Sequence, residues 1–72
     1  MRLGGEEITP KLLRERVGLT QQQVAIALGK RVGTVSEWER RLYAPRLTFR
    51  ETLKLMEIYQ CTLEDLAEAF DE

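Results

Sequence analysis

Apolar residues recur at helical spacing in several short stretches of the chain, separated by polar and turn-forming residues. Val24 and Leu28 lie four positions apart and Val35 and Trp38 lie three apart, so each pair falls on one side of a short helix. A final stripe repeats at i, i+3, i+4 and i+7 and comprises Leu63, Leu66, Ala67 and Phe70. No alternating apolar run is bounded by an Asn-Gly or Asp-Gly turn, so the pattern predicts helices rather than strands.

Threonine residues mark where four of the expected helices begin. Thr9 is followed by Pro10, which fits an N-cap and a proline in the first helical position. Residues 20–23 and 48–51 have the sequence of capping boxes, and residues 62–65 form a weaker one. Together with one further helix that has no cap, these starts predict an all-α fold of five short helices.

The helix without a cap is expected from about Val32 to Arg40, and Arg31 stands where its cap would be. It follows the preceding helix after a short turn, in which Gly29 can adopt the positive φ that ends a helix sharply. Ala25 is small enough to let the two helices cross closely. A helix, a glycine stop, a short turn and a second helix form a helix-turn-helix unit. The missing cap is a local inconsistency of the kind that marks functional positions.

A chain of 72 residues is long enough for one domain. We expect residues 9–72 to form that domain and residues 1–8 to be a flexible N-terminal arm, because the glycine and acidic residues near the start have little to bury. The sequence has neither a signal peptide nor a long apolar run, which predicts no membrane partner and a cytoplasmic protein.

Few side chains suited to metal binding or catalysis are present. The chain has no histidine, and its single cysteine, Cys61, cannot form an intrachain disulfide. No group of residues can therefore be assigned the roles of nucleophile, base and oxyanion donor. We expect no metal, no cofactor and no enzymatic activity, with Cys61 as an inert thiol in the core.

The net charge of −1 hides a strong separation of charge along the chain. Residues 30–50 contain six basic and two acidic side chains, whereas residues 51–72 contain one basic and seven acidic side chains. A solvated surface with charges clustered by chance is one interpretation. The other is a basic centre beside an acidic end, which attracts a polyanion to one face only.

The stretch from Gln21 to Arg40 resembles the helix-turn-helix of the phage repressor and Cro group, also called the XRE family. The shared residues, in order and at the family's spacing, are Gln21, Ala25, Gly29, Val35, Trp38, Glu39 and Pro45. The segment YQCTLEDL, residues 59–66, resembles the family's closing pattern, so the resemblance covers about residues 12–66. It implies a lambda-repressor-like domain that places the second helix of the unit in the DNA major groove.

The resemblance also implies a function. It indicates a sequence-specific transcription regulator, in the first instance a repressor, in the cytoplasm of a prokaryote or of a phage host. Such a protein binds a two-fold operator on double-stranded DNA as a homodimer, with half-sites about 34 Å apart. The alternative is an antitoxin or another protein-interaction module with the same fold, whose acidic C-terminal helix binds a basic protein partner. Strong salt dependence of duplex binding distinguishes the first from the second.

The residues expected to contact DNA lie at the start of the first helix of the unit, in its turn, and on the outward side of the second helix. They are Gln21, Gln22, Lys30, Arg31, Val32, Gly33, Thr34, Ser36, Glu37, Arg40 and Arg41. By resemblance, Gln21 binds a phosphate through its backbone N–H and its amide. Glu37 is placed to accept a hydrogen bond from cytosine N4, and Arg40 and Arg41 are placed to meet phosphates. For each residue taken singly, a plain surface side chain is the alternative.

Three further expectations concern the scaffold. The family pairs an arginine of its first helix with the glutamate near the end of the second helix of the unit, which implies a partly buried ion pair between Arg14 and Glu39. Leu63 and Leu66 are expected to close the core. Phe70 lies beyond them, either as a contact in a two-fold dimer or folded back on its own domain.

The sequence also departs from the family's pattern. Arg41 stands where the family commonly has a glycine, so we expect the chain to leave the second helix differently. The segment between Pro45 and the last helix is longer than usual, and the fourth helix is therefore expected to begin or tilt differently.

Overall fold

The computed structural model describes residues 7–70, which form five α-helices and no strand. The helices are α1 (Pro10–Arg16), α2 (Gln21–Leu28), α3 (Val32–Glu39), α4 (Phe49–Tyr59) and α5 (Leu63–Phe70). The predicted all-α architecture of five short helices is therefore confirmed. Arg40, expected as the last residue of the third helix, instead follows it as the C-cap.

The threonine caps form as the sequence predicts. The Thr9 hydroxyl accepts a hydrogen bond from the Leu12 N–H, and Thr20 and Thr48 open complete capping boxes. Before α5, the Thr62 hydroxyl accepts from the Asp65 N–H while the Asp65 carboxylate accepts from the Thr62 N–H. Helix α3 alone has an N-cap, Arg31, without a side-chain hydrogen bond to the backbone.

Four helices end in the same way, with one residue in the left-handed conformation. Gly18, Gly29, Arg41 and Gln60 have φ values of 73°, 69°, 59° and 52°. After α3, the Arg41 N–H donates to the Trp38 carbonyl and the Leu42 N–H donates to the Glu37 carbonyl, the pair of bonds of a Schellman motif. The expectation that the exit at Arg41 would differ is wrong. The two bonds offset the strain of about 1–2 kcal/mol that a non-glycine residue suffers in this conformation.

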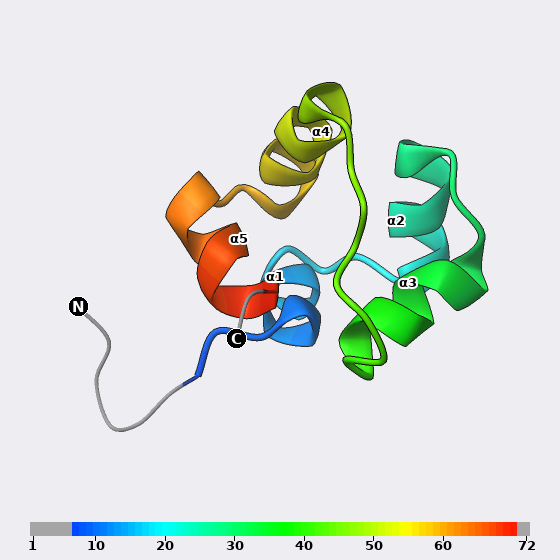
Figure 1. Cartoon of the computed structure of the whole chain (residues 1–72), viewed down its shortest axis with the longest axis horizontal. Coiled ribbons are helices and arrows are strands. Elements are labelled where there is room, and N and C mark those ends of the chain that lie inside the picture. The colour runs from blue at the N-terminus through cyan, green and yellow to red at the C-terminus, as the bar shows by residue number, and fades with distance from the viewer. Residues whose placement is uncertain (1–6, 71–72) are drawn as a thin grey trace.

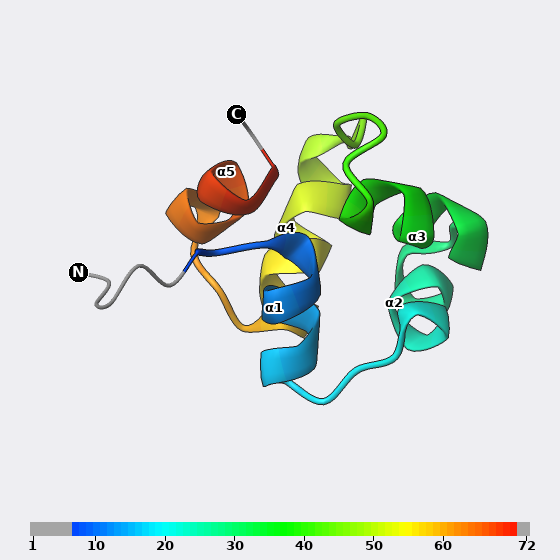
Figure 2. The same cartoon turned by 90° about the horizontal axis from the view of Figure 1, so that it is seen from below.

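Helices α2 and α3 pack together at one end of the molecule and α5 lies at the other, with α1 and α4 between them (Figure 1). The view from below shows the same order (Figure 2). Helix α1 contacts α3, α4 and α5, and α2 contacts both α3 and α4. The core lies between these helices and includes the fully buried Leu13, Val24, Val35, Leu55 and Tyr59.

Two expectations about the edges of the core are wrong. Ile8, assigned to the flexible arm, is buried in the core cluster with Leu13, while residues 1–6 lie outside the described residues. Ile8 directly precedes the cap Thr9, the position from which an apolar side chain packs onto the first turns of a helix. Leu63 is 57% exposed and does not close the core, whereas Leu66 is buried as expected.

Candidate nucleic-acid interface

A polar network joins the end of α3 to α1 and α2. The Arg14 guanidinium donates from Nε to Glu39 Oε2 at 2.6 Å and from Nη2 to Glu39 Oε1 at 3.1 Å. A third N–H of Arg14 donates to the Leu19 carbonyl at 2.9 Å. The two side chains of the ion pair are only 12% and 6% exposed, and the hydrogen bond to Glu39 raises the pKa of Arg14. This pair therefore anchors α3 to the scaffold by its C-terminal end.

The amide of Gln21 takes part in the same network. Its Nε2 donates to Glu39 Oε1 at 2.9 Å, so one of its two amide N–H groups is used inside the protein rather than on a phosphate. Gln21 is the first residue of α2, and the backbone N–H groups of a first helical turn have no carbonyl partner within their helix. The backbone N–H and the second amide N–H thus remain as the donors that Gln21 can present to an anion.

Apolar contacts fix which side of α3 faces inward. Val35 is fully buried and Trp38 is 3% exposed, with its ring edge-on to Phe70 at a centroid distance of 6.2 Å. The opposite side faces outward, and Arg31, Val32 and Gly33 at the N-terminal end are exposed. Val32 keeps 47% of its surface exposed although it is apolar. The first turn of α3 is therefore open to solvent and carries no acidic residue.

Further along α3, the outward side is partly covered. Thr34, Ser36 and Glu37 are half-buried. The Tyr43 hydroxyl donates to Glu37 Oε1 at 2.6 Å, and this hydrogen bond raises the pKa of Tyr43. Glu37, expected to accept from cytosine, is thus already an acceptor within the protein, and its orientation is set by Tyr43.

Lys30, expected to reach toward DNA from the turn, is held by α4. Its Nζ lies 3.0 Å from Glu51 Oε2, and both side chains are 28% exposed. The Glu51 carboxylate also accepts from the Thr48 N–H, and this hydrogen bond, followed by the one from Lys30, lowers the pKa of Glu51. The positive charge of Lys30 is therefore largely neutralised by its partner.

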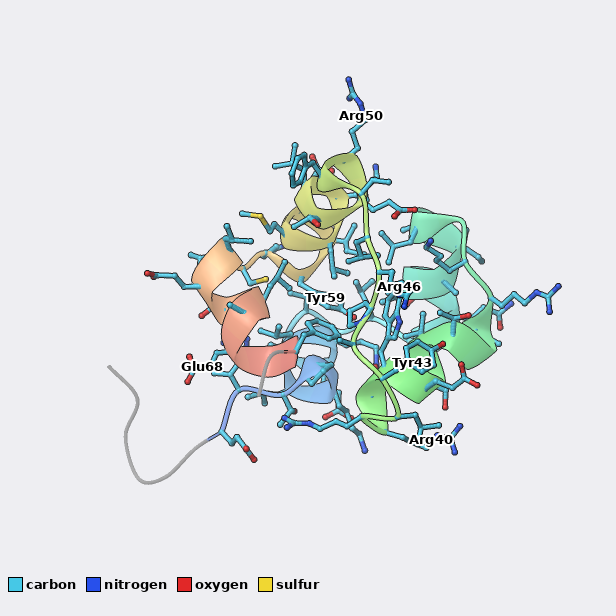
Figure 3. All side chains as sticks on the ribbon, viewed as in Figure 1. Arg40, Tyr43, Arg46, Arg50, Tyr59 and Glu68 are labelled. Carbon is cyan, nitrogen blue, oxygen red and sulfur yellow. The ribbon has the colours of Figure 1, made fainter. Side chains whose placement is uncertain are left out.

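A hollow of about 660 Å³ lies between α3 and the segment that connects it to α4. Its lining includes Lys30, Thr34 and Trp38 on one side and Tyr43 and Arg46 on the other. Figure 3 shows Tyr43 and Arg46 on the connecting segment beside α3, with Arg40 at the end of the helix. Arg46, which lines this hollow, and Arg40, at the end of α3, are both exposed, as is Arg31 at the N-cap of α3.

Sequence reasoning did not assign Arg46 or Tyr43 to the site. Arg46 belongs to the basic segment of residues 30–50, so its charge was a signal, but no periodic pattern placed it near α3. Nothing in the sequence indicated that Tyr43 would bind Glu37. Gln22 and Arg41, both expected to contact DNA, are exposed, at the start of α2 and after the end of α3.

The remaining predicted residues are placed as follows. Phe70, one candidate for a dimer contact, is half-buried against Trp38, which is the folded-back alternative. Cys61 is half-buried beside the core, and burial raises the pKa of its thiol. Within residues 7–70, no helix is long and apolar enough to cross a membrane, and no three side chains of the metal-binding types are grouped together.

Two short helices joined by a tight turn, the second packed against the core on one side and exposed to solvent on the other, define the helix-turn-helix class of domains. The sequence model described as "Helix-turn-helix domain" matches residues 11–69, and the chain belongs to this family. Membership confirms the fold and the resemblance inferred from residues 21–40, and it indicates DNA binding in a family that is typically non-enzymatic. No curated protein and no solved structure matches the chain.

Replacing Gly33 by alanine is expected to stabilise the fold by up to about 1 kcal/mol, because alanine favours a helix. A Cβ at Gly33 would meet no atom within 4 Å. The matched control is Gly29→Ala, which should destabilise the protein by about 1–2 kcal/mol because Gly29 has a positive φ. Thermal unfolding followed by circular dichroism measures both. A loss of stability in Gly33→Ala would show that the fold itself requires the glycine.

Proposed function

We propose that the protein binds duplex DNA by inserting α3 into the major groove, with the N-terminal turn of α3 toward the base edges. The observation that carries this proposal is the asymmetry of α3. Val35 and Trp38 hold one side in the core, while the uncapped first turn on the other side is exposed and includes an apolar residue, Val32. An uncapped helix N-terminus has unpaired N–H groups and a partial positive charge, both of which favour an anionic partner.

The side chains of that turn suit base readout. The Val32 methyl groups can contact a thymine methyl, and the Arg31 guanidinium can donate to the two acceptors of guanine. Gly33 has no side chain to read a base, and the open space around it leaves room for the DNA to approach the backbone. Thr34 and Ser36 add hydroxyl groups that suit either base edges or phosphates.

Phosphate contacts are assigned to the residues around this turn. Arg40, Arg41 and Arg46 carry the positive charge that follows α3, and Gln21 and Gln22 present the first N–H groups of α2. Such contacts fix position and orientation on the duplex without reading its sequence. Glu37 contributes through its remaining lone pairs, in the orientation that Tyr43 imposes.

In the cell, we propose that this binding is sequence-specific and regulates transcription, with repression as the simplest outcome for a domain that occupies an operator. A homodimer on a two-fold operator, with half-sites about 34 Å apart, provides the specificity that one short helix lacks. The cytoplasm of a prokaryote or of a phage host is the proposed location.

Selection of bound duplexes from a random pool tests the proposal. We expect enrichment of one motif, and binding to it should weaken with salt in proportion to the number of phosphates contacted. Arg40→Gln and Arg46→Gln should each reduce the slope of log K against log salt by about 1. Lys11→Gln, an exposed residue of α1, is the control and should leave the slope unchanged. A pool without enrichment and an affinity insensitive to salt would reject DNA binding.

A second candidate function rests on the acidity of α5, whose first turn carries Glu64 and Asp65. An antitoxin or other interaction module would bind a basic protein through this helix. Binding to such a partner should then be lost on reversal of Glu64, and it should be indifferent to Arg40→Gln and Arg46→Gln.

A further inference from the structure

The hollow between α3 and the segment that connects α3 to α4, which we call the α3 hollow, has the size and the walls of a small-molecule site. Its volume of about 660 Å³ falls within the range of about 300–1,000 Å³ that ligand pockets occupy. Its walls are mainly aromatic and apolar and include Trp38, Tyr43, Ala44 and Pro45. A mostly apolar concave surface with a few polar groups is the usual composition of such a site.

The two aromatic rings of the α3 hollow come from different segments. Trp38 belongs to α3 and is 3% exposed, so only a small part of it is accessible from the hollow. Tyr43 belongs to the connecting segment and is held by the hydrogen bond from its hydroxyl to Glu37. Offset and edge-on contacts between aromatic rings are favourable, so rings held in place in this way suit a further ring. The hollow therefore favours a ligand with a planar aromatic body.

One cation of the α3 hollow has no counter-charge. Lys30 lines the hollow too, but its ammonium group is paired with Glu51 at 3.0 Å. Arg46 is exposed and makes no ion pair with any residue between 7 and 70. Figure 3 shows Arg46 and Tyr43 on the side of the connecting segment that faces α3. A guanidinium binds a carboxylate through two parallel hydrogen bonds. A single negative charge therefore balances the hollow, whereas a phosphate dianion would keep an unmatched charge.

We propose that the α3 hollow binds a planar aromatic monocarboxylate, with the ring of the ligand against Trp38 and Tyr43 and its carboxylate on the Arg46 guanidinium. Thr34 lines the same hollow, and its hydroxyl is a hydrogen-bond partner for a polar substituent of the ring. Duplex DNA does not supply such a group, because its rings are stacked within the duplex and its backbone is charged rather than apolar.

The connecting segment borders a second cavity, which gives it room to adjust around a ligand. A smaller hollow of about 230 Å³ shares Trp38, Tyr43 and Ala44 with the α3 hollow and extends to Phe70. Tyr43 and Ala44 are exposed and line both hollows, so a shift of these two residues toward a ligand displaces no side chain of the core.

The ligand and DNA compete for Arg46, which the proposed function assigns to a backbone phosphate. One guanidinium cannot pair fully with both anions, so the ligand should lower the affinity for DNA, and DNA should lower the affinity for the ligand by the same factor. The DNA-binding domain would then itself respond to a small anion. This consequence rests on the proposed function, whereas the ligand site does not.

Titration of the full 72-residue chain with para-nitrobenzoate, followed by the fluorescence of Trp38, tests the site without DNA. Trp38 is the single tryptophan of the chain, and a nitroaromatic ring in contact with it quenches its emission. We expect saturable quenching, with a dissociation constant of about 1 mM or lower for a ligand of this size. The neutral para-nitrobenzamide should bind about tenfold more weakly, because it lacks the charge that pairs with Arg46. Quenching that does not saturate, or that is equal for both compounds, would overturn the proposal.

Variants of Arg46 test whether the ligand lies in the α3 hollow. Arg46→Gln should raise the dissociation constant of para-nitrobenzoate about tenfold, and Arg46→Lys should raise it less, because lysine keeps the charge but loses the paired hydrogen bonds. Arg50→Gln is the matched control, since Arg50 is an exposed arginine of α4 outside the hollow, and it should leave the affinity unchanged. Circular dichroism should show all three variants folded. An Arg46→Gln variant that binds para-nitrobenzoate like the unmodified chain would overturn the site.

Competition with the selected duplex tests the consequence for DNA binding. Saturating para-nitrobenzoate should weaken duplex binding about tenfold. Sodium acetate at the same concentration is the control for ionic strength and should have little effect, because acetate has no ring to occupy the hollow. An unchanged affinity for the duplex with the ligand bound would overturn competition for Arg46. A chain that selects a motif but shows no saturable quenching rejects this inference alone, whereas a chain that binds para-nitrobenzoate but selects no motif rejects the proposed function alone.

Discussion

Replacing Glu39 by glutamine is expected to lower the free energy of unfolding by about 3–5 kcal/mol. Glu39 accepts two hydrogen bonds from Arg14 and one from Gln21, and both members of the ion pair are almost fully covered by protein. Glutamine has one acceptor oxygen and no charge, so the Arg14 guanidinium would remain buried without a counter-charge. A domain of this size has only a small reserve of stability, and much of the variant should be unfolded at 25 °C.

Urea denaturation followed by far-ultraviolet circular dichroism measures this loss. Glu57→Gln is the control, because Glu57 is exposed and its 3.8 Å ion pair with Lys54 lies in solvent, where such pairs contribute about 0–1 kcal/mol. The double variant Arg14→Met with Glu39→Leu should recover most of the stability, since it removes both charges together. A Glu39→Gln variant that loses less than about 1 kcal/mol would show that water reaches the ion pair.

The fold was predictable wherever a local signal specified it. Each threonine cap needs only the three residues that follow, and the stop at Gly29 needs only the absence of a Cβ. The same motif at Arg41 and Gln60 was not predicted, because there the capping hydrogen bonds outweigh the preference of the residue.

The burial of Ile8 has a local signal in the sequence. Ile8, Leu19, Leu47 and Cys61 each directly precede a threonine cap, and all four are buried or packed against the core. An apolar residue in that position packs against the first turns of the helix and fixes the entry of the chain. Leu63 differs from expectation in the opposite direction, because it was expected in the core and is exposed. It shares a stripe with Leu66, but α5 buries only Leu66 and Ala69, and Leu63 stays exposed.

The candidate site was predictable for α3 and much less so for its surroundings. The spacing of Val35 and Trp38 determined which side of α3 is buried, and hence that Arg31, Val32 and Gly33 face outward. The partners of Lys30 and Glu37 come from α4 and from the segment between α3 and α4. That segment has no periodic pattern, so its path and its contacts through Tyr43 and Arg46 follow only from the tertiary structure.

Val32→Glu is expected to weaken binding to the selected duplex at least about 100-fold, because a carboxylate among phosphates and base acceptors costs several kcal/mol. The fold should change in stability by less than about 1 kcal/mol, since Val32 is half exposed and an acidic residue in the first turn interacts favourably with the helix dipole. Fluorescence anisotropy with the selected duplex measures the affinity, and urea denaturation measures the stability.

Val32→Gln separates charge from shape at the same position. It removes the apolar contact without adding a carboxylate, so it should weaken binding by only about tenfold, the equivalent of one lost methyl contact of about 1–2 kcal/mol. The order of affinity should therefore be valine, glutamine, glutamate, while stability stays nearly constant. Because no loss of folding accompanies the loss of binding, the effect can come only from contact between the first turn of α3 and the DNA. A folded Val32→Glu variant that binds the duplex like the unmodified chain would place the DNA on another side of the domain.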